Sequence, residues 1–189
     1  MEDLIDNHFH QSIEAKIEHA DSLTLPLAHA AALLTDCLLR GGKVLICAEG
    51  LSAPLASTLA HCMLHGQRLE RPGLPALVLS QSFHDHNIPE GLFSNQISAL
   101  GARQDILVAI SPGQATQSLL SAIVTAQQCG LDIIVLTAPG HEPIAHQLRK
   151  SDVELYVNND NPYRVQEIHL LTLFCLCELI ESNLFGGAL

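Results

Sequence analysis

Five short runs of mostly aliphatic residues mark the chain after residue 42. They are KVLICA (43–48), PALVLS (75–80), DILVAIS (105–111), DIIVLT (132–137) and DVELYV (152–157). Short runs that are apolar at both alternating sets of positions are typical of strands buried in a parallel sheet. Most of the intervals between them are about 15 to 25 residues of helical character, enough for a crossover. The pattern predicts an α/β fold, a three-layer sandwich with a five-stranded parallel sheet flanked by helices.

Two helices are predicted before the first strand. The first covers residues 3–20 and has an apolar stripe of residues four positions apart, namely Ile5, Phe9, Ile13 and Ile17. The second runs from Pro26 to Leu39, with the proline in its first turn and Gly41-Gly42 as a stop signal. We assign residues 1–41 to a helical pair used in oligomerisation and residues 42–189 to the α/β core of a single domain.

A long last helix is predicted over residues 164–184, and it is apolar on more than one face. Its apolar residues are Val165, Ile168, Leu170, Leu171, Leu173, Phe174, Leu176, Leu179 and Ile180. Two apolar faces need two packing partners, which we take to be the sheet and a second subunit. The alternative is burial of the helix within one monomer, because 189 residues can enclose a central helix.

Composition agrees with one compact domain and restricts its partners. Apolar residues make up 48% of the chain, aromatic residues only 4%, and the mean hydropathy is +0.25, so the core is aliphatic. The net charge of −11 repels polyphosphate, which argues against direct nucleic-acid binding but is compatible with a basic protein partner.

The sequence predicts a soluble, cytoplasmic protein. It begins without a basic segment followed by an apolar stretch, so no signal peptide is indicated. The longest apolar run, Leu170 to Cys177, is far shorter than the ~20 residues that a bilayer requires. The six cysteines form no CxxC pair and lie in apolar segments, as expected of buried thiols in a reducing compartment.

Two loops follow strands in the form that binds anions in α/β folds. CAEGLSAP follows the run at 43–47, and SPGQATQS follows the run at 105–110. At such corners, free N–H groups at a helix N-terminus and hydroxyl side chains hold a ligand. The second loop offers four suitable residues, Ser111, Gly113, Thr116 and Ser118, although Pro112 and Gln114 weaken it. In the first loop, Glu49 places a carboxylate where an anion would rest. The alternative is that both loops are plain turns with helix caps.

Histidines offer a second kind of chemistry. His61 and His65 stand four apart beside Cys62, a spacing that suits a metal, but no third ligand is near in sequence, so we predict no metal site. HDH (84–86) is interpreted as a polar loop. His169, in the first turns of the last helix, is placed to point toward the strand ends and act as a base, with no matching acid evident from the sequence.

The order and spacing of five segments resemble the sugar isomerase (SIS) domain family. The segments are GGKVLICAEGLSA, RPGLPALVLS, DILVAIS, DIIVLT and RVQEIHLLTLFCLCELIE. Within the family the chain resembles the sedoheptulose-7-phosphate isomerase group, and most closely its DnaA initiator-associating (DiaA) branch. The resemblance implies a five-stranded parallel sheet, a homotetramer and, for the isomerases, a pocket between subunits in which a glutamate and a histidine move protons between ketose and aldose phosphates.

Several positions depart from the isomerase pattern. The histidine and a nearby glutamine are present as His169 and Gln166, but the glutamate position is occupied by Cys62, preceded by His61. The family's Gly-Asn-Gly turn reads Ala48-Glu49-Gly50, and its Ser-Thr-Ser-Gly-Asn-Ser cradle reads SPGQAT over 111–116. The segment SQSFHDHNIPEGLF, after the second strand, is several residues shorter than in the family.

These departures lead to the expectation of a protein that is not an enzyme and uses no cofactor. We expect an adaptor that binds the replication initiator DnaA and promotes its assembly at the chromosomal origin, with Leu184 and Phe185, just before Gly186, as partner contacts. Those two residues have an alternative role in packing the oligomer. The competing hypotheses are a sedoheptulose-7-phosphate isomerase that uses His169, and a regulatory protein that holds a vestigial phosphosugar through Ser52, Ser111 and Thr116.

Overall fold

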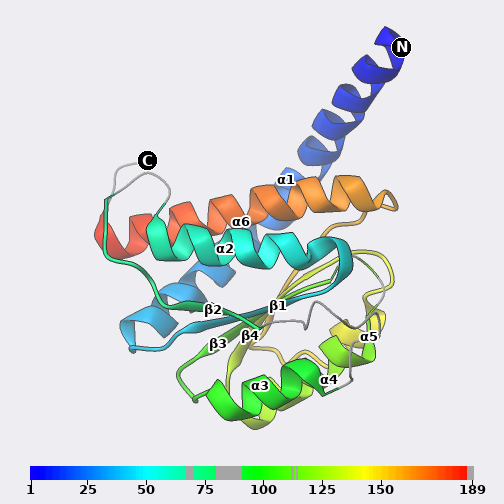
Figure 1. The fold of residues 1–189 in the computed structure, drawn as a ribbon. Coiled ribbons are helices and arrows are strands. Elements are labelled where there is room, and N and C mark those ends of the chain that lie inside the picture. The colour runs from blue at the N-terminus through cyan, green and yellow to red at the C-terminus, as the bar shows by residue number, and fades with distance from the viewer. Residues whose placement is uncertain (67–69, 80–90, 112, 114, 187–189) are drawn as a thin grey trace.

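The sheet at the centre of the domain has five parallel strands in the order β2-β1-β3-β4-β5, as seen in the computed structural model (Figure 1). The structure describes residues 1–66, 70–79, 91–111, 113 and 115–186. The strands are β1 (Val44–Ala48), β2 (Ala76–Val78), β3 (Ile106–Ile110), β4 (Asp132–Thr137) and β5 (Val153–Tyr156). Each corresponds to one of the five aliphatic runs, so the predicted sheet is confirmed.

The strand sequences are apolar throughout because helices cover both faces of the sheet. Val44 and Ile46 of β1 contribute to one buried cluster, and Leu45 and Cys47, which alternate with them, contribute to the other. β3 divides in the same way, and both strands are buried at every position. The period of two along each strand therefore produces two hydrophobic cores, one on each side of the sheet.

Two helical layers complete the sandwich (Figure 1). One face is covered by α1, α2 and α6, and the other by α3, α4 and the short α5. The helices are α1 (Glu2–Leu39), α2 (Ala53–His65), α3 (Leu92–Leu100), α4 (Gln117–Gln128), α5 (Glu142–Ala145) and α6 (Pro162–Phe185). A single 3₁₀ turn, η1 (Gly50–Ser52), connects β1 to α2. The chain thus has the predicted three-layer α/β architecture.

The predicted pair of leading helices is wrong, because α1 is a single helix that continues through Pro26. Proline inside a helix removes one N–H donor but does not have to end the helix when packing on both sides of it is favourable. Here buried residues lie on both sides of the proline, from Ala15 and Leu23 to Ala30 and Leu34. Their shared packing against α6 and the sheet stabilises one continuous helix.

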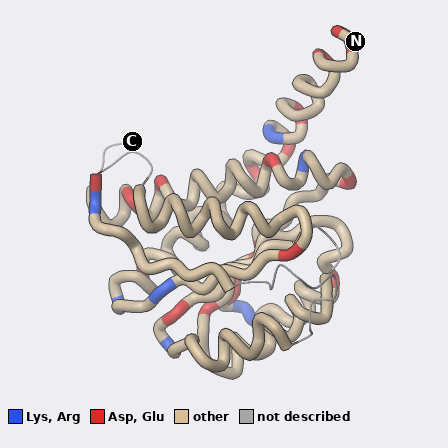
Figure 2. The backbone as a smooth tube through the Cα atoms, viewed as in Figure 1, with Lys and Arg blue, Asp and Glu red and all other residues tan. Residues whose placement is uncertain are grey.

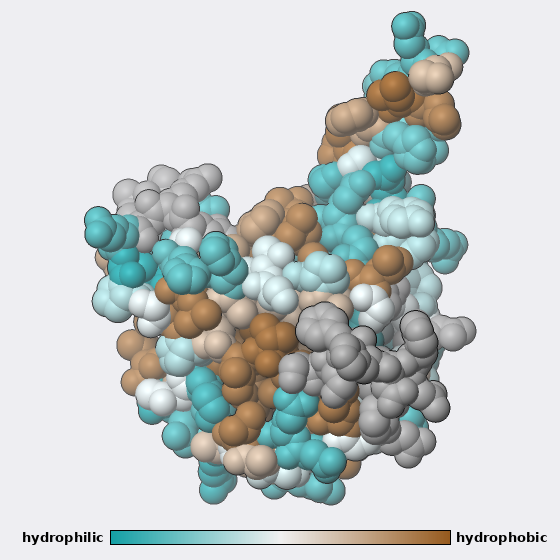
Figure 3. Space-filling model, viewed as in Figure 1, coloured by the Kyte–Doolittle hydropathy of each residue, from teal (hydrophilic) through white to brown (hydrophobic). Residues whose placement is uncertain are grey.

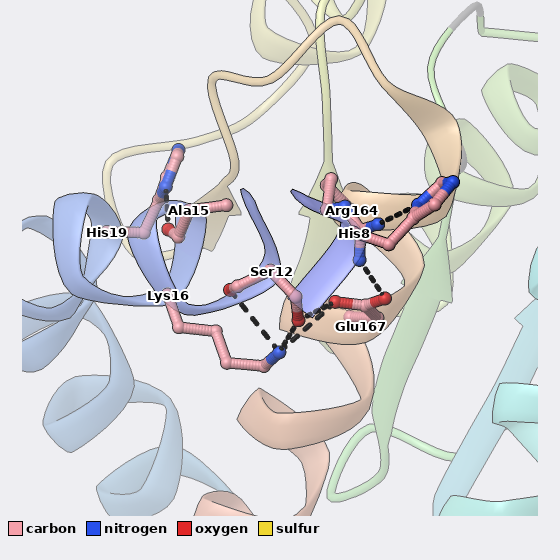
Figure 4. A network of polar contacts seen from close by, with 7 residues as sticks. All are labelled: His8, Ser12, Ala15, Lys16, His19, Arg164 and Glu167. Atoms are coloured by element: carbon pink, nitrogen blue, oxygen red, sulfur yellow. Dashed lines mark hydrogen bonds and ion pairs between the residues drawn. The ribbon is translucent and has the colours of Figure 1, made fainter. Parts of the chain in front are cut away.

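A network of polar contacts attaches the N-terminal half of α1 to the start of α6 (Figure 4). Glu167 is the centre of this network: it accepts hydrogen bonds from Ser12 and Arg164, and Lys16 Nζ lies 3.1 Å from its Oε2. Arg164 also contacts His8 Nδ1 at 3.0 Å. Although burial opposes it, these hydrogen bonds keep the pKa of Glu167 below its usual value. Beyond this network the first turns of α1 project from the domain (Figure 1).

By length and composition alone, α1 and α6 are long and apolar enough to cross a membrane. In the fold, however, α6 packs against α1 and α2 and buries three ionisable side chains, Arg164, His169 and Glu181. Buried ionisable groups are costly in a bilayer, whereas core helices of soluble proteins pass the same length test. We therefore interpret α6 as a core helix.

The lysines and arginines of the described residues are few and scattered over the backbone (Figure 2).

Candidate functional site

The predicted site residues come from loops and helix starts that follow the carboxyl ends of the strands. Because all strands are parallel, these ends share one edge of the sheet, where ligands bind in open α/β folds. The crossover helix after β1 lies on one face of the sheet and the helix after β3 on the other. The gap between the ends of β1 and β3 is therefore the topological switch point, at which such folds bind ligands.

His169 lies in the second turn of α6 and has no exposed surface. Its Nε2 is 3.2 Å from the carbonyl oxygen of Thr137 at the end of β4. A carbonyl only accepts, so we assign the proton to Nε2 and the lone pair to Nδ1, which is buried and has no partner among the described residues. Burial lowers the pKa of His169 to about 4, although the Thr137 hydrogen bond opposes this shift. The imidazole is therefore neutral at pH 7.

Gln166 and Ser52 are brought together across 114 residues of sequence. Gln166 Nε2 donates to Ser52 Oγ at 3.1 Å, which joins η1 to the first turn of α6. Ser52 is fully buried and immediately precedes α2. Gln166 lies one turn before His169 on the same helix. The loop after β1 and the candidate base are thus held in a fixed relation by one side-chain contact.

The corner after β3 centres on Thr116. Its hydroxyl caps α4 by accepting from the backbone N–H of Leu119 at 3.2 Å, and it donates to Oε2 of Glu49. Ser111 Oγ donates to the carbonyl oxygen of Gly113 at 3.0 Å. Pro112 and Gln114 lie outside the described residues. All three hydroxyls predicted to hold a ligand, those of Ser52, Ser111 and Thr116, therefore contact other protein groups in this structure.

The environment of Glu49 at this corner can be predicted only in part from the sequence. Only 4% of its surface is exposed, and its second carboxylate oxygen, Oε1, is buried without a partner among the described residues. The sequence indicates a carboxylate near the anion position. Its hydrogen bond with Thr116, 67 residues away, has no local signal.

Cys62 does not lie beside His169 within one chain. It is on α2 near Cys177, whose pKa is raised to about 12 by burial and by the neighbouring Cys62 thiol. Cys177 is eight residues beyond His169 on α6, or roughly 12 Å along the helix. Cys62, at the position that matches the family's glutamate, is therefore separated from His169 within the single chain. All six cysteines are free.

The remaining residues singled out in the sequence are two pairs of histidines and the end of α6. The rings of His61 and His65 lie against each other with their centroids 4.7 Å apart and their planes tilted by 44°. The described residues contain no group of three or more candidate metal ligands. HDH (84–86) and most of the segment after β2 lie outside the described residues. Leu184 packs against the core, and the half-exposed Phe185 ring lies below the guanidinium of Arg71.

Comparison with known proteins shows the family. A family model described as the SIS domain matches residues 8–138. The phosphoheptose isomerase of Alkalilimnicola ehrlichii is 38% identical over 193 residues, which covers 98% of each chain. That of Methylococcus capsulatus is 40% identical over 96% of each chain. The structure of a phosphoheptose isomerase from Francisella tularensis superposes with a TM-score of 0.88 at 34% identity, covering 95% of this chain and 97% of that one.

These relatives overturn the prediction of a non-catalytic adaptor for DnaA. The prediction depended on Cys62, on Glu49 and on a likeness to the initiator-associating branch, but relatives that match almost the whole chain bear the name of an enzyme. Substitutions at a few site positions leave the fold, His169 and its contacts in place, so they are weak grounds for excluding catalysis. The chain belongs to the SIS domain family, in its phosphoheptose isomerase group.

Proposed function

We propose that the chain is an isomerase that interconverts the ketose and aldose forms of a phosphorylated heptose. The observation that carries the proposal is His169, a neutral imidazole held at the strand ends, whose Nδ1 has no partner among the described residues. Sugar isomerisation moves a proton between two neighbouring carbon atoms, which requires a base that accepts the proton and returns it. The names of the full-length relatives, phosphoheptose isomerase, support the same reaction and substrate class.

His169 performs the proton transfer in this proposal. Nδ1 removes the proton from the carbon beside the carbonyl group, giving an enediolate and an imidazolium. The hydroxyl proton of the enediolate then moves to the neighbouring oxygen, and the imidazolium returns its proton to the former carbonyl carbon. The Thr137 carbonyl keeps Nε2 protonated and fixes the orientation of the ring. Gln166 is a positioning residue, because it holds the loop at Ser52 against α6. His169 is fully buried in the single chain, so the substrate reaches Nδ1 only when the residues that cover the ring move.

The test is conversion of sedoheptulose 7-phosphate by the purified protein in D₂O, followed by NMR for both product and deuterium at the transferred carbon. We expect turnover by the wild type and a loss of about 10²–10⁴-fold in kcat for His169→Asn, the usual contribution of a general base. His29→Asn, at an exposed position on α1, is the matched control and should retain activity. Absence of turnover in the wild type would refute the proposal, and full activity of His169→Asn would place the base elsewhere.

We further propose that the chain forms a homo-oligomer, a tetramer as the family resemblance implies, through the first turns of α1. Ile5, Phe9, Ile13 and Ile17 are each more than half exposed in the single chain. Hydrophobic side chains gather on the projecting part of α1 (Figure 3). An apolar groove of about 230 Å³ follows between α1 and α6. Exposed apolar surface of this kind is typical of an interface between subunits.

The cytoplasmic location expected from the sequence stays a prediction.

Replacement of Ile13 and Ile17 by glutamate is expected to dissociate the oligomer, because the new charges would be buried at the interface. Light scattering at a fixed protein concentration measures the mass. Asn7→Glu, on the opposite side of α1 from the stripe, adds the same charge and is expected to leave the mass unchanged. A wild type that runs as a monomer, or a double variant of unchanged mass, would contradict this assembly.

A further inference from the structure

The carboxylate of Glu49 lies between the end of β1 and the start of α4, at the kind of corner where open α/β folds bind anions. Glu49 directly follows β1 and is almost fully buried. Oε2 accepts from Thr116, the residue that caps the twelve-residue helix α4, while Oε1 has no partner among the described residues. A helix N-terminus and an unpartnered, buried carboxylate oxygen therefore occur at the same corner. The two observations are independent, and both indicate a ligand.

A phosphate bound here without further help would meet an uncompensated negative charge. Among the described residues, no lysine, arginine or histidine forms an ion pair with Glu49. Glu49 also occupies the Thr116 hydroxyl, one of the donors that a phosphate would otherwise use. Since like charges in a buried site repel strongly, the substrate and Glu49 need a positive charge between them.

We propose that Glu49 binds a hard divalent cation, represented by Mg²⁺, which links the free carboxylate oxygen to the phosphate of the substrate. This inference depends on the proposed function, because it takes the substrate to be phosphorylated. Mg²⁺ is commonly held by one or two carboxylates together with substrate phosphates and water, so a single protein carboxylate is sufficient. The cation reverses the effect of Glu49, which then attracts the phosphate instead of repelling it.

The surroundings of Glu49 favour a hard cation over a soft one. Cys47, two residues earlier on β1, is the nearest sulfur in sequence. The Cys47 side chain is fully buried in the hydrophobic cluster on the face of the sheet that α3 and α4 cover, so it packs against apolar residues. The described side chains at the corner include the oxygen atoms of Glu49, Thr116 and Ser111. Oxygen ligands are the set that Mg²⁺ prefers over Zn²⁺.

Thermal unfolding with inorganic phosphate and MgCl₂ tests the inference without depending on catalysis. For the wild type we expect that either salt alone, with EDTA present in the phosphate sample, leaves the Tm unchanged, while the two together raise it by roughly 5 °C at saturation. For Glu49→Gln we expect phosphate alone to raise the Tm and Mg²⁺ to add nothing. Glu154→Gln is the matched control, because Glu154 also accepts a threonine hydroxyl, from Thr137 at 2.6 Å. It should behave as the wild type does.

Mn²⁺ provides a direct measure of proximity. When Mn²⁺ replaces Mg²⁺, its unpaired electrons should broaden the ³¹P signal of phosphate bound to the wild type, and this broadening should be lost in Glu49→Gln. Stabilisation of the wild type by phosphate in EDTA would overturn the inference. The inference would also be overturned if Glu49→Gln still needed both Mg²⁺ and phosphate for stabilisation, or if no sample of the wild type were stabilised.

Failure of the cation proposal and failure of the proposed function give different results. If EDTA leaves turnover unaffected and phosphate binds without metal, the cation proposal is refuted and the isomerase proposal stands. If Mg²⁺ and phosphate together stabilise the protein but the protein shows no turnover, the cation site stands and the isomerase proposal is refuted.

Discussion

Replacement of Arg71 by alanine is expected to lower the free energy of unfolding by about 3–5 kcal/mol, the usual effect of removing one partner from a buried ion pair. Arg71 Nη2 lies 2.8 Å from Glu181 Oε1, and only 2% and 3% of the two side chains are exposed. The same guanidinium donates to the carbonyl oxygens of Cys62 and Met63 at 3.0 and 2.8 Å. The alanine variant therefore removes the paired cation from the buried Glu181 carboxylate and one of the donors from each of the two carbonyl groups. Urea unfolding followed by circular dichroism measures the loss.

Two variants separate this effect from a general loss of arginine. Arg40→Ala removes an ion pair with Asp132 that is 3.5 Å long and largely exposed, and should cost no more than about 1 kcal/mol. The double replacement Arg71→Met with Glu181→Leu removes both charges together and should recover much of the lost stability. A small effect of Arg71→Ala, comparable to that of Arg40→Ala, would show that other contacts compensate the Glu181 carboxylate.

Acidification should destabilise the protein through His169. Burial lowers the pKa of this imidazole from 6.5 to about 4. Between these values the unfolded chain binds a proton that the folded chain does not, so the free energy of unfolding falls as the pH decreases. The contribution is complete above pH 6.5 and is lost progressively toward pH 4, with a total of about 3 kcal/mol. Unfolding measured in urea at several pH values, at one protein concentration, gives the slope.

His169→Asn should flatten the pH dependence over this range, since asparagine does not titrate. His29→Asn, an exposed histidine on α1, should leave the slope as it is in the wild type. Glu167 also loses stabilising contacts when it is protonated, but that loss begins near its ordinary pKa of 4.5 and continues toward lower pH, and it is common to all three proteins. Parallel profiles for the wild type and His169→Asn would show that the imidazole is hydrated in the folded protein.

The sheet and its flanking helices could be predicted from the sequence because their signal is local. β1 and β3 are apolar at every position, which in a short run is characteristic of a strand covered on both faces. Pro26 misled the prediction of α1, because local rules give proline the role of a helix start, whereas tertiary packing on both sides of it stabilises the continuous helix.

The candidate site was less predictable because its contacts join distant segments. His169 could be identified from its place in the last helix, but its Thr137 partner and its depressed pKa depend on burial. The Glu49 contact with Thr116 and the Arg71 pair with Glu181 span 67 and 110 residues, and nothing near either residue indicates the other. Residue identity at Cys62 and Glu49 suggested lost catalysis, but identity alone does not say which groups a fold brings together.

Helix α6 carries the candidate base near one end and the Arg71 contact near the other. An α-helix of 24 residues is a stiff rod of roughly 36 Å, which resists compression along its axis. A shift at the anchored end is therefore passed on to the imidazole with little damping. A substitution that moves the Glu181 end of α6 along the helix axis is therefore expected to displace the His169 ring, several turns away.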